Sequence, residues 1–279
     1  MTSDQIAALT TTQAANLTSA QVAALTTAQI VGLETADLAA MTAANVVQLS
    51  TANIAELSTA QVVAMGTAQF ASMTTAQVSA MSTEQLAAID TADIRAMSGA
   101  QLASLDTAQI SSLTADQMAA IDTLDLRSLS TASVEALTTE QLVALGTGGI
   151  RGLTTTQFQA LTSEQLSNLS TTQVAALETA SIRAISTAEF AALTSDQVTA
   201  FTSTQMGGFS TDQMAALTST QLVAIETGDL RGFTGAQFSA LNTEAIAGLT
   251  TAQTAALSST HLAALTLSLI HISEPTRPL

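Results

Sequence analysis

The sequence predicts an all-α solenoid, a superhelix of short helices with one helix in each eight-residue repeat. Three observations lead to this fold class. Residues 1–264 divide into 33 consecutive octads without an insertion, apolar residues occupy two fixed positions of the octad, and a helix-capping pattern recurs beside them. Internal repetition over this much of a chain outweighs any single local motif.

Each octad contains a signal for the start of a helix. Every octad has Thr or Ser at position 2 or position 3, and position 5 is Gln in 21 of the 33 octads. A hydroxyl residue three places before Gln is a capping box, in which the hydroxyl accepts a hydrogen bond from the Gln backbone N–H and the Gln side chain reaches back to the cap N–H. Positions 4 to 8 are rich in Ala, which favours helix. The array therefore predicts one helix start per octad.

Positions 1 and 6 form the predicted core. Position 1 is Leu, Met, Ile or Phe in every octad, and position 6 is apolar in every octad except the one with Thr254. Position 6 and the next position 1 are three residues apart and share one face of a short helix. Position 8 is Ala, Gly or Ser apart from Asn16, Gln48, Glu56 and Asn168, which suits a place where backbones pass closely.

One continuous helix is excluded by geometry. Two apolar positions in eight residues would rotate the apolar stripe by roughly 80° per octad, so the stripe could not stay buried. Helices of five or six residues are unstable alone and must be held by neighbours, as stacking in a solenoid provides. The alternative is a β-solenoid, because parallel β-helices also use short, Thr-rich repeats. In a strand, however, positions 1 and 6 would point to opposite faces.

Five octads, which we call the acid octads, pair an acid at position 2 with Asp or Ser at position 5. They begin at Leu33, Ile89, Ile121, Leu177 and Ile225. Acids in the first turn of a helix complement the helix dipole, so a structural role is the main interpretation.

All arginines of the array occupy position 7: Arg95, Arg127, Arg151, Arg183 and Arg231. Arginine in the last helical turn also complements the dipole and can bond orphan carbonyls, which favours a solvated structural face. The alternative hypothesis is a charged ridge that binds a ligand or partner. Successive arginines are four, three, four and six octads apart, which suits a superhelix of about 3.5 to 4 octads per turn.

The composition argues against several classes of function. There are 22 acids, six arginines and no lysine, and the net charge of −16 disfavours binding to nucleic acid and to anionic membranes. The absence of cysteine excludes disulfides and thiolate chemistry. No apolar run is long enough for a membrane span, and the N-terminal MTSDQIAAL lacks the features of a signal peptide.

No catalytic, metal-binding or cofactor-binding residue is predicted. His261 is the one histidine of the array and takes the position usually held by Gln, so we interpret it as a surface or capping residue. The carboxylates have no paired spacing, and neither an EF-hand loop nor a calcium-binding nonapeptide occurs. We therefore expect a protein that is not an enzyme.

The octads LTSAQVAA and LTTAQIVG resemble repeat tracts of large bacterial secreted or surface proteins described as haem-utilisation, adhesin-like or RTX-associated. The resemblance covers residues 1–264. It implies an extracellular or cell-surface spacer or stalk, and no motif supports haem binding. The alternative is a helical solenoid that binds a protein or peptide, with a protein or a cell-surface ligand as its partner.

Residues 265–279 do not continue the repeat. Leu265 and Thr266 resemble the start of a further octad, whereas LSLIHISEPTR at 267–277 matches, codon by codon, a transposase adapter used to prepare sequencing libraries. We expect this tail to be foreign and to leave the array, so that His271, Pro275 and Pro278 carry no functional weight. Met1 occupies a position-1 slot, where internal methionines are common, so we expect the natural start to lie elsewhere.

Overall fold

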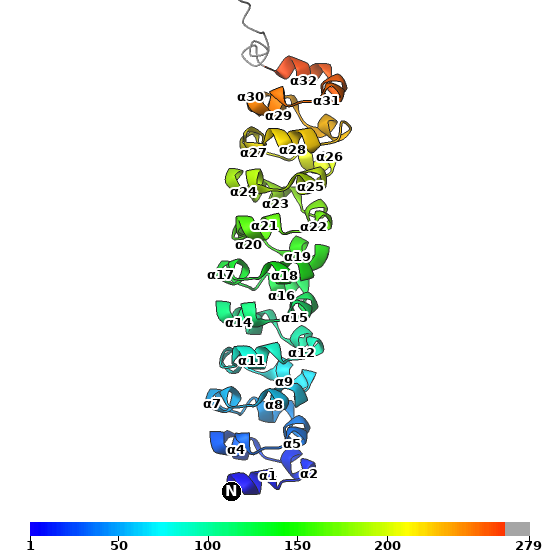
Figure 1. Ribbon diagram of the computed structural model, residues 1–279. Helices are drawn as coiled ribbons and strands as arrows, with labels where there is room; N and C mark the ends of the chain where they lie inside the picture. The colour runs from blue at the N-terminus through cyan, green and yellow to red at the C-terminus, as the bar shows by residue number, and fades with distance from the viewer. Residues whose placement is uncertain (266–279) are drawn as a thin grey trace, which may run out of the picture. The chain divides into compact units, whose positions relative to one another are not determined.

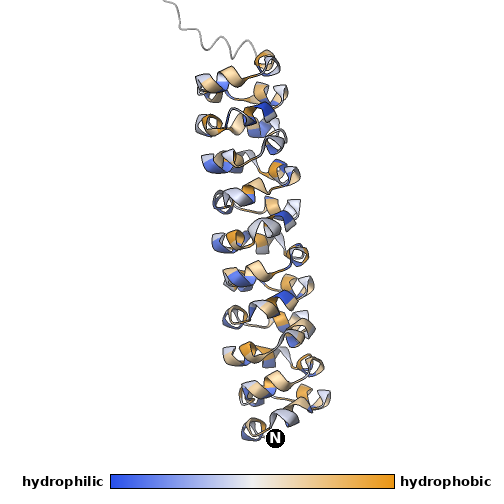
Figure 2. Cartoon of the chain, turned by 90° about the vertical axis from the view of Figure 1, so that its right-hand side faces the viewer, coloured by the Kyte–Doolittle hydropathy of each residue, from blue (hydrophilic) through white to orange (hydrophobic). Residues whose placement is uncertain are grey.

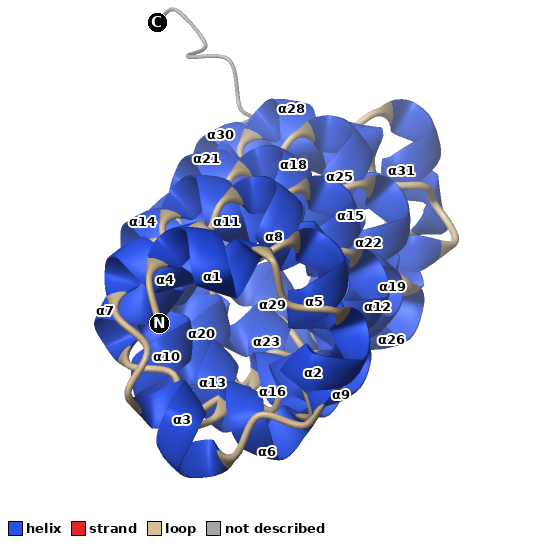
Figure 3. Cartoon of the chain, turned by 90° about the horizontal axis from the view of Figure 1, so that it is seen from below, coloured by secondary structure: helices blue, strands red, loops and turns tan. Residues whose placement is uncertain are grey.

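The computed structural model describes residues 1–265 and contains only helices and loops in that range (Figure 3). The predicted all-α fold is confirmed, and the β-solenoid alternative is wrong for these residues. The chain divides into two compact units, Met1–Leu145 (unit 1) and Gly146–Leu279 (unit 2), which are described separately. The adapter-like tail, 266–279, lies outside the described residues.

Unit 1 contains one α-helix of four to six residues in each octad. The helices are α1 (Ser3–Ala7), α2 (Thr11–Ala15), α3 (Ser19–Ala23), α4 (Thr27–Val31), α5 (Thr35–Ala40), α6 (Ala43–Val46), α7 (Thr51–Ala55), α8 (Thr59–Ala64), α9 (Thr67–Ser72), α10 (Thr75–Ser79), α11 (Thr83–Ala87), α12 (Thr91–Ala96), α13 (Gly99–Ala103), α14 (Thr107–Ser112), α15 (Ala115–Ala120), α16 (Thr123–Leu126), α17 (Thr131–Glu135) and α18 (Thr139–Ala144).

Unit 2 continues the pattern, with a single turn of 3-10 helix, η1, in the octad that begins at Ile225. Its described elements are α19 (Gly146–Gly152), α20 (Thr155–Gln159), α21 (Ser163–Ser167), α22 (Thr171–Ala175), α23 (Thr179–Ala184), α24 (Thr187–Ala192), α25 (Ser195–Thr199), α26 (Ser203–Met206), α27 (Thr211–Ala216), α28 (Ser219–Ala224), η1 (Asp229–Gly232), α29 (Gly235–Ala240), α30 (Thr243–Ala247), α31 (Thr251–Ala256) and α32 (Ser259–Ala264).

The predicted capping box starts most of these helices. In α10, Oγ1 of Thr74 accepts a hydrogen bond from the Gln77 N–H at 3.2 Å, and Oε1 of Gln77 accepts one from the Thr74 N–H at 2.9 Å. Thr74 itself has extended backbone angles, φ −72° and ψ 157°. Because the cap residue is extended while the next residues are helical, the chain changes direction at every octad.

Within each unit, a helix packs against the helix three octads further along. In unit 1, α2 contacts α5, and α5 contacts α8 (Figure 1). In unit 2, α24 contacts α27, which contacts α29. Individual helices carry both hydrophobic and hydrophilic residues (Figure 2). Positions 1 and 6 of nearly all octads are buried, as predicted.

Position 8 lies where successive turns approach closely, which confirms the reason for its small residues. A Cβ added at Gly208 would collide with the Thr179 side chain, and one added at Gly232 would collide with the backbone of Ser203. Each of these contacts joins position 8 to the position-3 residue that lies 29 residues earlier.

Gly146 has φ +61°, the one positive φ among the described residues. It stands at position 2 of its octad, where other octads carry a cap residue, and α19 begins at Gly146 itself. In this left-handed region a side chain carries a steric penalty that glycine avoids.

We expect Gly146→Ala to lower the free energy of unfolding by about 1 kcal/mol because of this conformation, although no atom lies within 4 Å of the added Cβ. Urea unfolding of the full chain, followed by circular dichroism, measures the effect. Gly148→Ala is the matched control in the same helix, and it should stabilise by up to about 1 kcal/mol through helix propensity. Equal effects of the two substitutions would contradict the prediction.

Candidate functional site

In most octads the side chain of the position-5 Gln is buried and bonds to two turns of its unit. In α13, Oε1 of Gln101 accepts the Ser98 N–H at 2.7 Å, which completes the capping box of its own helix. Its Nε2 donates to the carbonyl oxygens of Phe70 and Met73, both at 2.8 Å and located 31 and 28 residues earlier. We call these donated bonds the position-5 latch.

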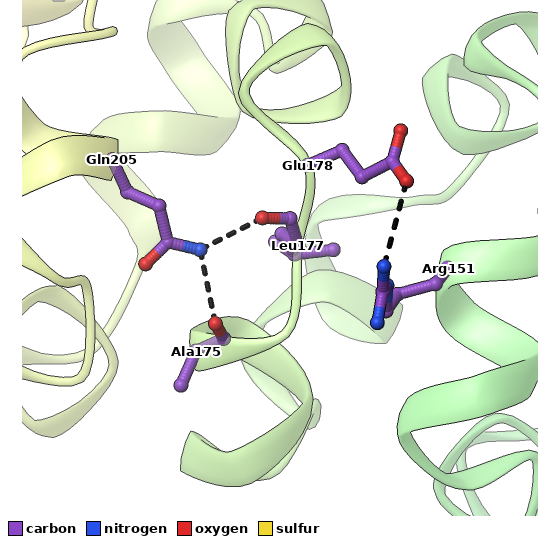
Figure 4. Close-up of polar contacts among 5 residues, drawn as sticks. All are labelled: Arg151, Ala175, Leu177, Glu178 and Gln205. Atoms are coloured by element: carbon purple, nitrogen blue, oxygen red, sulfur yellow. Dashed lines mark hydrogen bonds and ion pairs between the residues drawn. The ribbon is translucent and has the colours of Figure 1, made fainter.

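The latch recurs through both units. Nε2 donates to carbonyls 28 to 31 residues earlier, between three and a half and four octads. Figure 4 shows the latch of Gln205, whose Nε2 lies 3.1 Å from the Ala175 carbonyl and 2.7 Å from the Leu177 carbonyl. The Gln residues that form this latch include Gln29, Gln61, Gln69, Gln77, Gln85, Gln101, Gln109, Gln117 and Gln141 in unit 1, and Gln197, Gln205, Gln213, Gln221, Gln237 and Gln253 in unit 2.

The latch satisfies groups that a short helix leaves unpaired. A helix ends with carbonyls that have no partner within it, and a solenoid of short helices has many such ends. The acceptors of the latch are the carbonyls at positions 6 and 7 of one octad and position 1 of the next. The position-6 carbonyl also accepts a backbone N–H, as Val46 does from Leu49 at 3.1 Å, so the position-1 carbonyl is the one that depends most on the latch. Each bond stabilises by about 1 kcal/mol net, and leaving the buried carbonyl unpaired costs about 1 to 3 kcal/mol.

Other donors replace Gln in the same slot. Nδ2 of Asn45 and of Asn53 reaches the carbonyl 28 residues earlier, at 2.7 Å from Leu17 and 2.9 Å from Leu25. Where position 5 is Ala245, the position-2 residue Asn242 supplies the donor instead. Its Nδ2 lies 3.0 Å from the Ala215 carbonyl and 2.9 Å from the Leu217 carbonyl.

His261 is also a latch residue. Its Nε2 lies 2.9 Å from the Phe233 carbonyl, 28 residues earlier, and its Nδ1 accepts the Ser258 N–H at 3.4 Å. This pairing requires the tautomer with the proton on Nε2. The ring is buried and stacks on Phe238 with the ring centres 4.4 Å apart. The predicted capping role is confirmed, and the predicted surface position is wrong because the ring fills the slot of a buried Gln.

Sequence reasoning missed the latch although the composition of position 5 contains a signal for it. A capping box accepts Glu as readily as Gln, and an acid suits a helix N-terminus better. Position 5 nevertheless holds 21 Gln and one Glu, Glu189. Glu189 accepts the Ser186 N–H at 2.9 Å, so it completes a capping box without a donor for the previous turn. The preference for Gln over Glu at position 5 is therefore explained by the second hydrogen bond, which the side-chain NH₂ donates to the carbonyls of an earlier turn.

The acid octads depart from this scheme. At the N-caps Glu34, Asp90, Asp122 and Glu178 the side chain makes no cap hydrogen bond. The position-5 carboxylate instead meets the position-3 residue of an earlier octad. Asp93 accepts a hydrogen bond from the Thr67 hydroxyl at 2.8 Å, and Asp229 accepts one from the Ser203 hydroxyl at 2.6 Å.

Two of these carboxylates are buried. Asp37 is 2% exposed, and its Oδ2 has no hydrogen-bond partner among the described residues. Burial raises the pKa of Asp37 above its ordinary value, and the nearby Glu34 carboxylate raises it further. Burial also raises the pKa of Asp93, against an opposing effect of the Thr67 hydrogen bond and together with the charge of Asp90.

All five arginines of the proposed ridge are exposed. In unit 2, Arg151 forms an ion pair of 3.9 Å with Glu178 (Figure 4). Glu178 belongs to the octad that also contains Arg183. The side chains of Arg151 and Glu178 are about 60% exposed, so this pair stabilises little. Nε of Arg183 donates to the Gly208 carbonyl at 2.8 Å, on another turn of unit 2. A ridge formed by all five arginines stays a prediction.

No other feature of residues 1–265 resembles a chemical site. This range contains no cluster of three His, Asp or Glu side chains that could hold a metal ion. A shallow depression in unit 2 lies against α22 and α25 and is lined by Thr171, Thr172, Ala175, Asp196, Thr199 and Ala200. None of the helices in this range combines the length and hydrophobicity needed to cross a membrane.

The latch predicts a clear difference between amide and carboxylate at position 5. We expect Gln213→Glu to lower the free energy of unfolding by about 3 kcal/mol, because the capping box survives while the bonds to Ile182 and Ile185 are lost and a charge is buried. Urea unfolding measures the change. Gln5→Glu is the matched control, since Gln5 is exposed and Nε2 has no partner among the described residues. An effect of Gln213→Glu below about 0.5 kcal/mol would contradict the latch.

The comparisons with known proteins identify the repeat. Residues 30–67, 54–88, 86–123, 118–150, 139–171, 174–210, 222–259 and 236–267 match the family model of the ALTTAQ repeat. No curated protein matches the chain. The eight matches, most of which overlap, extend over most of the octads, in agreement with the LTTAQ-type repeat read from the sequence. The chain belongs to the ALTTAQ repeat family.

Proposed function

We propose that this chain is a structural spacer or stalk, without catalytic activity, from a large bacterial adhesin-like protein that is secreted or attached to the cell surface. The observation that supports this proposal most is the location of the aromatic side chains. All seven Phe residues are buried, and the protein has no Trp or Tyr. Aromatic side chains are the usual anchors of protein interfaces, so none is left for a partner.

The polar side chains support the same proposal. The position-5 amides, which could have formed a recognition surface, bond the protein to itself in most of the octads that carry one. The large apolar side chains that remain exposed are few. They include Leu124, Leu262 and four position-7 valines, Val31, Val63, Val143 and Val223. Scattered exposed valines are ordinary on protein surfaces. Repeated contacts between turns, together with a surface that has few candidate binding side chains, suit a spacer.

The proposed location rests on composition and resemblance. The chain has no cysteine, no lysine and a net charge of −16, which fits a soluble repeat in a secreted protein. The binding solenoid remains the competing function, and it requires a surface that distinguishes one octad from another.

The spacer proposal is tested by placing the full chain between an outer-surface anchor and an epitope on bacterial cells. We expect the epitope to approach the cell surface when the four octads of residues 65–96 are deleted, as measured by fluorescence quenching from a dye in the membrane. Replacing the four exposed position-7 valines by Ser is the control and should leave the epitope height unchanged. An unchanged height after the deletion would overturn the spacer proposal.

The same cells separate the spacer from a binding module. A spacer predicts that cells displaying the chain capture no protein beyond those captured by cells with the anchor alone. Capture of one stoichiometric partner, lost in the valine variant, would support the binding solenoid. For location, antibodies against residues 33–264 should label intact source cells, and labelling that requires permeabilised cells would overturn the surface assignment.

A further inference from the structure

The position-5 slot selects for a hydrogen-bond donor. Three different groups fill it, namely the Gln amide, the shorter Asn amide and the His261 imidazole, and each donates to the carbonyl 28 residues earlier. An ionised Asp in this slot has only acceptors, so it cannot make the bond that the slot provides.

Asp and Asn have the same length, which makes the comparison with Asn45 and Asn53 direct. Both Asn side chains reach the position-1 carbonyl three octads earlier. For Asp37 the corresponding acceptor is the carbonyl of Leu9, also 28 residues earlier. Asp37 is buried in this slot with one oxygen unpartnered.

We propose that the buried acid octads are proton-operated latches, in which the carboxylate of Asp37 or Asp93 takes up a proton from solvent and the resulting O–H donates a hydrogen bond to the carbonyl that a Gln amide would bind. For Asp93 the acceptor is the Met65 carbonyl, while its Oδ1 keeps the bond from the Thr67 hydroxyl. Acidification therefore closes the latch, and ionisation opens it. This inference stands on the latch geometry and is independent of the proposed spacer function.

The carboxylates on the same octads favour protonation of Asp37 and Asp93. α5 packs against α2 and α8, neither of which contains a charged or titratable side chain, and Glu34 on its own octad favours the neutral form of Asp37. α12 packs against α9, which has no such group, and against α15, which contributes Asp116. On its own octad Asp93 has Asp90 and Arg95, and the Asp90 charge favours protonation.

The direction of the pH dependence follows from the raised pKa values. A carboxyl whose pKa is higher in the folded state than in the unfolded state binds its proton more tightly when folded, so protonation stabilises. The stabilisation is present at low pH and is lost as pH rises through the raised pKa. Its window therefore lies above the ordinary Asp value of 3.8.

The test is amide hydrogen exchange of the full chain at about pH 4.5 and about pH 7.5, corrected for the intrinsic pH dependence of exchange. We expect protection of α5 and α12 to be higher at the lower pH, by about tenfold for each unit by which the pKa is raised. Asp37→Asn should give high protection of α5 at both pH values and leave the response of α12 unchanged.

The reciprocal variant separates the latch from the general effect of the acidic net charge. Asn45→Asp should give α6 a pH dependence that it lacks in the native chain, because α6 packs against α3 and α9, which carry no charged side chain. The proposal is overturned if α5 of Asp37→Asn keeps the native pH response or if α6 of Asn45→Asp gains none. A carboxyl ¹³C titration of Asp37 at or below its ordinary pKa would also overturn it.

Discussion

The position-5 amide is the interaction on which the rest of each unit depends. Its carbonyl oxygen holds the first turn of its own helix, and its NH₂ group holds the end of a helix on another turn. A helix of four to six residues cannot stand alone, because the unpaired N–H and C=O groups at its ends outnumber its internal hydrogen bonds. One side chain that pairs the start of one helix with the end of another makes such short helices usable.

The reach of this amide also constrains the spacing of the turns. Most of the donated bonds of the position-5 amides bridge 28 to 31 residues, so each turn places the same carbonyls opposite the same side chain. Small residues at position 8 keep the backbones close enough for that reach, as at Gly208 and Gly232. The apolar side chains at positions 1 and 6 then stabilise the stack by hydrophobic burial. The hydrophobic effect is not directional, so it does not by itself fix how the turns are aligned.

Gln, Asn and His side chains can all donate the latch hydrogen bond from position 5, and a donor at another position of the octad can replace them. Asn242 supplies the bond from position 2 where position 5 is Ala245, which shows that the carbonyls and not a particular residue define the requirement. The acid octads are then the informative exceptions. Four of the five place an Asp carboxyl where the other latches have an N–H, and in unit 1 two of these carboxyls are buried. Uniform construction elsewhere leaves few side chains for recognition, consistent with a spacer.

The sequence by itself determined the octad, the helix starts, the apolar core and the small residue at position 8. All of these follow from local rules, since capping boxes join residues three apart and helix faces repeat within a turn. Local rules also placed His261 correctly as a cap, but they said nothing of its burial against Phe238. The second bond of Gln, the orphaned oxygen of Asp37 and the pairing of Arg151 with Glu178 were decided only by the tertiary structure. Each depends on which residues 25 to 31 positions apart in the sequence come into contact, and that separation is set by the stacking of turns.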